Sequence, residues 1–170
     1  MPVVSPARLS EIAGEVGFAR AEHAIREAYS MWSWGGMVDV LQRATMTQME
    51  KEPELATVFL FHGSGYLREA ALDLLDGPLD QPILCYGVAQ RLNDWVPAVR
   101  VAAKAAMARC YPETATGTLA PAVWALMLNA AGWQRWGDGY TQFMGQVLSR
   151  QGLVAVLIED CLRAFPGSGR

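Results

Sequence analysis

The chain has 170 residues, of which 52% are hydrophobic and 18% are charged, a balance typical of one folded domain and not of an intrinsically disordered chain. Its formal net charge of −3 gives no general attraction for phosphates and disfavours nucleic acid as the main ligand. The longest nearly apolar window, 119–133, is shorter than the ~20 residues that a membrane-spanning helix needs, and the N-terminus shows no secretory signal. We therefore expect a cytoplasmic protein with no membrane contact.

Apolar residues recur at spacings of three and four along almost the whole chain, whereas alternating segments typical of strands are few. Glycine and proline breaks divide the chain into segments of roughly 10 to 16 residues, the ordinary length of a helix. A first helix is expected after Ser5 and Pro6, because serine can cap a free amide and proline fits the first turn. The sequence predicts a single all-α domain over 1–165 and a flexible C-terminal tail over 166–170.

Two pairs of helices are predicted in the middle of the chain. The first pair covers 54–61 and 63–75, and the second covers 81–92 and 93–110. The string Leu-Arg-Glu-Ala-Ala that starts at Leu67 matches Val-Arg-Val-Ala-Ala that starts at Val99, 32 residues further on. A repeated helix pair of this length is typical of an α-solenoid, because one pair cannot bury its apolar face alone and stacks on its neighbour.

The second pair resembles the HEAT-repeat family, whose units carry Asp, then Pro, then Val-Arg, then paired small residues. The matching positions are Asp94, Pro97, Val99, Arg100, Ala102 and Ala103. The first pair keeps Leu67, Arg68, Ala70 and Ala71 but has no proline. A third unit over 118–151 keeps two helices and Asp138 but lacks the arginine. The resemblance covers about 54–110 and implies stacked antiparallel helix pairs with degenerate repeats at both ends.

The residues of the repeated motif have a structural interpretation. The paired alanines let neighbouring helices approach closely, and Asp94 can cap the helix that begins at Pro97. Arg68 and Arg100 are expected in the groove between units, where a guanidinium can bind free carbonyls or a neighbouring carboxylate.

No motif for catalysis, metal binding or phosphate binding is found. The string around Ser64, HGSGY, lacks the glycines of a nucleophile elbow. The two histidines, His23 and His62, have no partner at zinc-ligand spacing. The acidic runs at 50–54 and 73–80 are interpreted as solvated helix ends. We expect a protein that is not an enzyme and holds no cofactor or metal.

The three cysteines are far apart, and each lies in a helical apolar pattern. The spacing suits neither a disulfide framework nor a zinc site. We therefore predict that Cys85, Cys110 and Cys161 are reduced thiols in the core.

Six tryptophans are the other unusual feature. Tryptophan packs well in cores but also anchors protein interfaces when it is partly exposed. Trp95 lies in a predicted turn, Trp133 and Trp136 are three residues apart, and Trp32 and Trp34 flank a break. The candidate protein-binding surface predicted from these features comprises Asp94, Trp95, Lys104, Trp133 and Trp136.

Stacked helix pairs make an extended surface suited to another macromolecule. The main functional hypothesis is a non-enzymatic protein-binding module, such as a bacterial immunity protein that occludes a basic toxin, or a small adaptor subunit. The alternative is a HEAT-like nucleic-acid-binding or DNA-glycosylase-type protein, favoured by the cluster of Arg100, Lys104 and Arg109, or a small-molecule binder similar to the bilin lyases.

Overall fold

The computed structural model describes residues 8, 11, 13–14, 17–30, 46–52, 55–129 and 132–164. Over these residues the regular structure is helical and contains no strand, so the predicted all-α class is confirmed for them. Ser5, Pro6, Trp32, Trp34 and the tail at 166–170 lie outside the described residues.

The helices follow the predicted segments closely. Their bounds are α2 Phe18–Ser30, α4 Leu55–Phe59, α5 Gly65–Leu74, α6 Pro82–Arg91, α7 Pro97–Cys110, α8 Thr116–Asn129, α9 Asp138–Leu148 and α10 Gln151–Ala164, and residues 46–51 are also helical. Pro82 and Pro97 each occupy the first turn of their helix, where the missing N–H leaves no acceptor unsatisfied.

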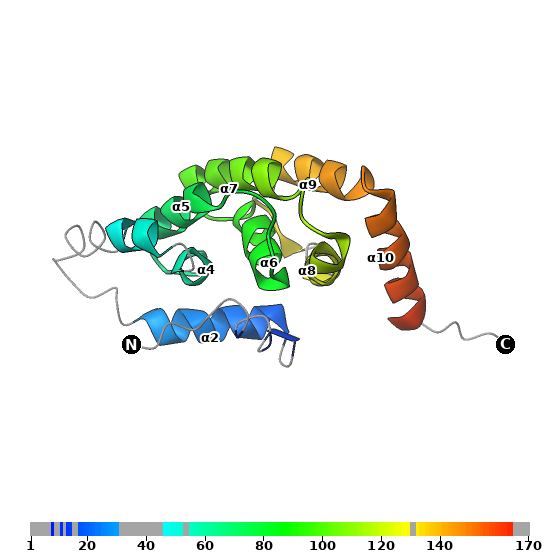
Figure 1. The fold of residues 1–170 in the computed structure, drawn as a ribbon, viewed down its shortest axis with the longest axis horizontal. Helices are drawn as coiled ribbons and strands as arrows, with labels where there is room; N and C mark the ends of the chain where they lie inside the picture. The colour runs from blue at the N-terminus through cyan, green and yellow to red at the C-terminus, as the bar shows by residue number, and fades with distance from the viewer. Residues whose placement is uncertain are drawn as a thin grey trace.

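The helices form two rows with a third layer below them (Figure 1). One row contains α5, α7 and α9, and the other contains α4, α6 and α8, with α10 at one end. Within the rows α5 contacts α7, α7 contacts α9, and α6 contacts α8, while α10 packs on both α8 and α9. The two helices that carry the repeated sequence motif, α5 and α7, therefore lie side by side.

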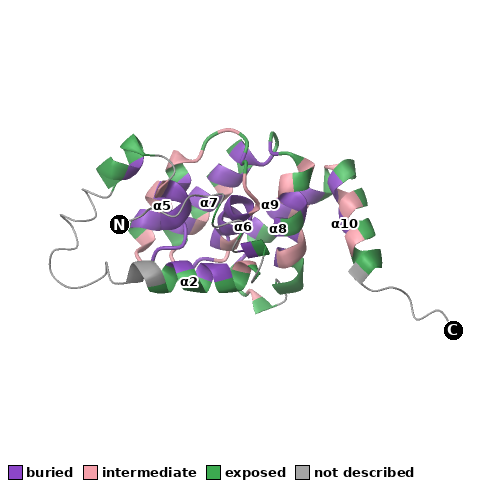
Figure 2. Cartoon of the chain, turned by 60° about the horizontal axis from the view of Figure 1, so that its bottom comes forward, coloured by how far each residue is buried: buried purple, intermediate pink, exposed green. Residues whose placement is uncertain are grey.

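The core lies where the two rows meet, and Figure 2 shows buried residues concentrated there. Nearly every residue of α6 is buried, because this helix is enclosed by α7, α8 and α2. Gly87 of α6 allows the closest approach, since a Cβ there would lie 2.9 Å from the Phe61 ring. The motif alanines Ala71, Ala102 and Ala103 are also buried, as expected for residues between closely packed helices.

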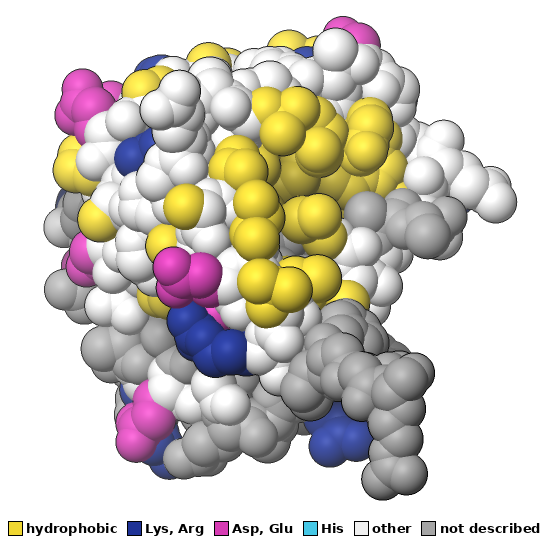
Figure 3. Space-filling model, turned by 90° about the vertical axis from the view of Figure 1, so that its right-hand side faces the viewer, with side chains coloured by type: hydrophobic (Ala, Val, Ile, Leu, Met, Phe, Trp, Pro, Cys, Tyr) yellow, Lys and Arg dark blue, Asp and Glu magenta, His cyan; other side chains and the backbone are white. Residues whose placement is uncertain are grey.

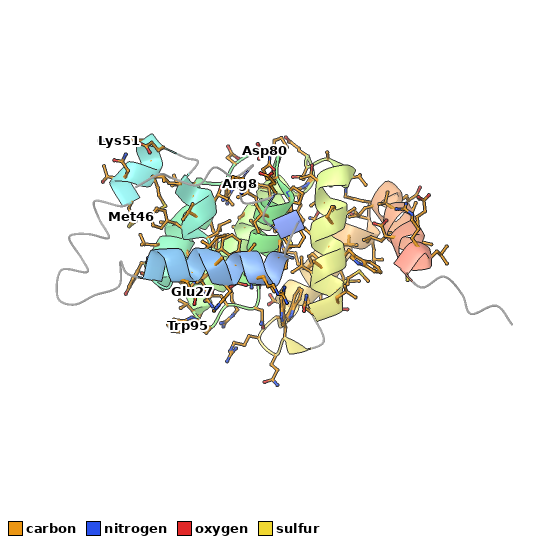
Figure 4. The ribbon with its side chains drawn as sticks, turned by 90° about the horizontal axis from the view of Figure 1, so that it is seen from below. Arg8, Glu27, Met46, Lys51, Asp80 and Trp95 are labelled. Atoms are coloured by element: carbon orange, nitrogen blue, oxygen red, sulfur yellow. The ribbon has the colours of Figure 1, made fainter. Side chains whose placement is uncertain are left out.

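Helix α2 lies below α4 and α6 in Figure 1 and therefore faces the viewer in Figure 4, which is seen from below. Its Phe18 ring stacks on Tyr86 of α6 with a centroid separation of 4.9 Å, and Ala21 and Ile25 are buried. Glu22, on the same helical face, accepts a hydrogen bond from the side chain of Gln90. None of the described helices is both long and apolar enough to cross a bilayer.

Candidate functional site

The turns that precede α5, α7 and α9 lie together along one edge of the molecule. The turn at Gly65 touches the next turn, because a Cβ on Gly65 would lie 2.9 Å from Val96 Cγ2. That second turn touches the third, because the Arg135 amide donates a hydrogen bond of 2.8 Å to Asn93 Oδ1. We call this surface, formed by residues 63–66, 93–96 and 133–140, the turn edge.

Each of the three turns presents an exposed aromatic side chain. The exposed fractions are 71% for Tyr66, 65% for Trp95 and 49% for Tyr140. Trp95 stands at the margin of the molecule in Figure 4, as the turn position predicts. Large rigid side chains in such positions are typical anchors of protein interfaces.

The third turn also contains a packed aromatic cluster. The Trp136 ring lies 4.7 Å from Trp133 and 5.5 Å from both Phe143 and Tyr140, measured between centroids. Trp133 is half-buried, but Trp136 is only 5% exposed. Its predicted place on the surface is therefore wrong, because Trp136 packs against Phe143 in the core and supports the exposed Tyr140.

Beneath Trp95 lies a buried ion pair. Arg68 Nε and Nη2 donate to the two Asp94 carboxylate oxygens, each at 2.8 Å, and both side chains are almost fully inaccessible. Arg68 Nη1 also donates to the carbonyls of His62 and Gly63 at 2.8 Å. The carbonyl and carboxylate contacts predicted for Arg68 are thus present, and its Cζ lies 5.8 Å from the Trp95 ring centroid.

Asp94 does not lie on the surface, and that part of the predicted binding site is wrong. Its carboxylate is held inside by Arg68 and by Arg91 Nη1 at 3.1 Å. Asp94 Oδ1 also accepts the Val96 amide at 2.9 Å. Asp94 thus fixes the turn before α7, whereas the predicted side-chain cap on α7 itself is absent. Arg100 Nη1 donates to the Asp94 carbonyl at 2.8 Å, a carbonyl contact of the kind predicted for it.

The buried network continues from this turn into α2. Arg91 Nη2 donates to Glu22 Oε1 at 3.1 Å and also to the Gln90 side chain. Arg91 Nε has no partner among the described residues. Sequence patterns did not identify Glu22 or Arg91, because nothing local shows that residues 69 positions apart meet in space.

Two pKa values reflect this environment. Burial alone would raise the pKa of Asp94, but hydrogen bonds from Arg68 and the Val96 amide, together with the charges of Arg68 and Arg91, outweigh it and lower the pKa. Burial and, secondarily, the nearby Arg68 charge lower the pKa of His62. His62 Nδ1 accepts the Ser64 amide at 2.9 Å, so the neutral imidazole is the form that fits.

Lys104 lies half-buried on α7 and pairs with Asp138 at the start of α9. Its backbone carbonyl accepts the Gln142 side chain at 3.2 Å. Lys104 therefore connects α7 to α9, and it borders the turn edge without being a free charge on it.

Tyr66 and Tyr140 belong to the turn edge although sequence reasoning missed them. A signal was available, because both lie within the first three positions of α5 and α9, where side chains flank the preceding turn. Their exposure depends on how the three turns stack, which the sequence does not show.

The cysteines are only partly as predicted. Cys85 and Cys110 are buried free thiols, and burial raises the pKa of Cys85 to about 12. Cys161 is exposed, although it comes four residues after the buried Leu157 and shares its helical face. Among the described residues, no three His, Cys, Asp or Glu side chains are grouped to hold a metal ion.

Comparison with known proteins gave no match to any family model, any curated protein or any solved structure.

Proposed function

We propose that this chain is a protein-binding module, built as a short α-solenoid of HEAT-like helix pairs, and that it binds its partner along the turn edge. Helix α7 contacts both α5 and α9, and helix α8 contacts both α6 and α10. These contacts support the stacked arrangement. They are the neighbour-to-neighbour contacts that a solenoid makes.

The observation that carries the proposal is the row of exposed aromatic side chains on three adjoining turns. Tyr66, Trp95 and Tyr140 leave large apolar surfaces in water although the helices behind them are well packed. Aromatic anchors of this kind contribute most of the binding energy in many interfaces. Trp95 is also held in place by Arg68, which limits the entropy lost when a partner immobilises it.

A protein partner fits this edge better than a nucleic acid does. The basic residues that favoured nucleic-acid binding already make contacts within the chain. Arg100 donates to the Asp94 carbonyl, and Lys104 pairs with Asp138. Arg109 donates to the carbonyls of Leu72 and Leu75 at 3.0 and 3.1 Å. Phosphate binding would compete with each of these contacts.

The test begins with covalent capture at a defined position. A photo-crosslinking amino acid is placed at position 95 or, as a matched control, at position 101, because Val101 is 67% exposed on the outer side of α7. We expect one protein to be captured from position 95 and not from position 101. The captured protein is then purified and its affinity for variants is measured by calorimetry.

Substitution of an anchor in that purified complex should be costly. Tyr66→Ala and Trp95→Ala are each expected to lose about 2 kcal/mol or more of binding free energy, roughly a 30-fold loss of affinity. Val101→Ala should change the affinity little. Equal affinities for all three variants, or tight duplex DNA binding that falls steeply with salt, would contradict the proposal. A basic captured protein would favour the immunity or adaptor form of it.

A further inference from the structure

We infer that helix α2 controls the turn that carries Trp95, through four buried charges that join the helix to that turn. Glu22 of α2 is thus a positioning residue for the turn edge. The coupling can be measured in the free chain, and only its effect on partner binding rests on the proposed function.

The four charges form a continuous buried row. Arg91 Nη2 donates to Glu22 Oε1 at 3.1 Å, and Arg91 Nη1 donates to Asp94 Oδ2 at the same distance. Asp94 also holds Arg68, whose Cζ lies 5.8 Å from the Trp95 ring centroid. Each of the four charged residues is 9% exposed or less, so their charges are stabilised by one another and not by water.

The charges in this row balance only when α2 is in place. Two arginines, Arg68 and Arg91, face two carboxylates, one from α2 and one from Asp94. Without Glu22 the two guanidiniums share a single carboxylate, and an uncompensated buried charge is costly. Arg26 lies 3.7 Å from the same Glu22 oxygen, but its side chain is 46% exposed, so solvent screens its charge.

Asp94 is the residue through which such an imbalance would reach the turn before α7. Its Oδ2 accepts hydrogen bonds from both Arg68 and Arg91. Its Oδ1 accepts the Val96 amide at 2.9 Å. When Arg91 loses Glu22, it either draws this carboxylate toward itself or turns away from it. Either movement loosens the bond to the Val96 amide and shifts the turn.

Burial of the Glu22 charge depends on how α2 packs. Phe18 stacks on Tyr86 of α6, and Ala21 and Ile25 are buried. Glu22 lies on the same helical face as these three residues, because positions three and four apart share a face. Docking of α2 on α6 and insertion of the Glu22 carboxylate beside the arginine are therefore one event.

Hydrogen exchange of the Val96 amide, followed by NMR on the full chain, tests the coupling without a partner. In Glu22→Gln this exchange should become about tenfold faster, because the amide is bonded for less of the time. Phe18→Ala weakens the docking of α2 but leaves all four charges, and it should change the exchange in the same direction. Because Phe18 is only half-buried, this variant should fold even if Glu22→Gln does not. The indole resonance of Trp95 should shift in both variants.

Two controls separate the coupling from general effects. Glu27→Gln changes a carboxylate of the same helix whose side chain is 72% exposed, and it should leave the exchange unchanged. Leu153→Ala removes a buried side chain from α10, at the end of the molecule that Figure 3 faces, where hydrophobic side chains gather on the surface. It should lower the overall stability but change Val96 exchange much less than Glu22→Gln does.

The affinity of the purified complex distinguishes this inference from the proposed function. When the competent turn is populated about tenfold less, the affinity for the captured partner should fall about tenfold in Glu22→Gln and not in Glu27→Gln. Unchanged Val96 exchange in Glu22→Gln and Phe18→Ala, or equally fast exchange in Leu153→Ala, would overturn the inference and leave the turn edge as a binding surface. Faster exchange in the first two variants with unchanged affinity would support the coupling and contradict binding along the turn edge.

Discussion

Arg68 is a charged residue with no exposed surface, and its surroundings explain how the charge is held there. Its guanidinium donates four hydrogen bonds, two to the Asp94 carboxylate and two to backbone carbonyls. A buried charge is costly unless it is both paired and hydrogen-bonded, and Arg68 meets both conditions. The pair joins the first turn of the turn edge to the second.

Removing one partner of this pair should strongly destabilise the fold. Arg68→Met leaves the Asp94 carboxylate buried with Arg91 as its remaining cation, and we expect a loss of about 3–5 kcal/mol in the free energy of unfolding. The exposed Arg163→Met should cost about 0.5 kcal/mol or less. Urea denaturation measures both variants, and equal losses would contradict the structural role of Arg68.

His62 should make stability depend on pH in a defined window. Its pKa in the folded state lies below the ordinary value of 6.5, so the unfolded chain takes up the proton first as the pH falls. The contribution of the neutral His62 to the free energy of unfolding is complete above pH 6.5. It declines as the pH falls through that value toward the pKa of His62 in the folded state. Protonation would also break the bond from the Ser64 amide to Nδ1.

Urea unfolding of the wild type at several pH values between about 8 and 5 should show this decline. In His62→Gln the free energy of unfolding should change less with pH over this range. His23→Gln is the matched control, because His23 is 75% exposed. An unchanged slope in His62→Gln would refute the prediction.

At the scale of the element, the contact between α6 and the end of α4 depends on a glycine. A Cβ on Gly87 would lie 2.9 Å from Phe61 Cζ and 3.2 Å from Leu60 Cδ1, and both neighbours are fully buried. A methyl group there forces α6 away from α4 or moves the Phe61 ring. Gly145 of α9 has no atom within 4 Å of its own Cβ position.

Two glycine-to-alanine substitutions should therefore have opposite effects. Gly87→Ala is expected to destabilise, because overpacking costs about 1–3 kcal/mol and exceeds the helix-propensity gain of about 1 kcal/mol. Gly145→Ala should stabilise by up to that gain. Thermal unfolding of both variants tests this, and a stabilised Gly87→Ala would show that α6 and α4 are less closely packed.

The sequence predicted the helices better than it predicted their surroundings. Local spacing placed both ends of α5 and α6 within two residues, the start of α7 at Pro97 was correctly predicted, and the repeat motif correctly gave Arg68 a structural role. The burial of Asp94 was missed because it depends on Arg68, which lies 26 residues away along the chain, and that of Trp136 was missed because it depends on how the turn before α9 packs on Phe143. The exposure of Cys161 was missed because its spacing from Leu153 and Leu157 predicts the same buried face, and only the packing shows that this face is no longer covered at Cys161.

At the scale of the whole molecule, the proposed solenoid implies that stability is transmitted between neighbours. Leu153→Ala removes a buried side chain from α10 at a cost of about 2–5 kcal/mol. Hydrogen exchange should then lose protection most in α10, less in α8 and α9, and least in α4 and α5. Equal loss across all the described helices would indicate one closed core and would argue against stacked units.

Trp95 lies between the solvent and the buried ion pair of Arg68 and Asp94. Its indole ring stands largely in water and yet covers the guanidinium of Arg68. A partner that tilts this ring away would let solvent reach the ion pair, while one that presses it flat would keep the pair dry. Because a partner that binds only the folded chain stabilises it, complex formation on that ring should raise the melting temperature, and it should do so least when the bound ring leaves the ion pair open to water.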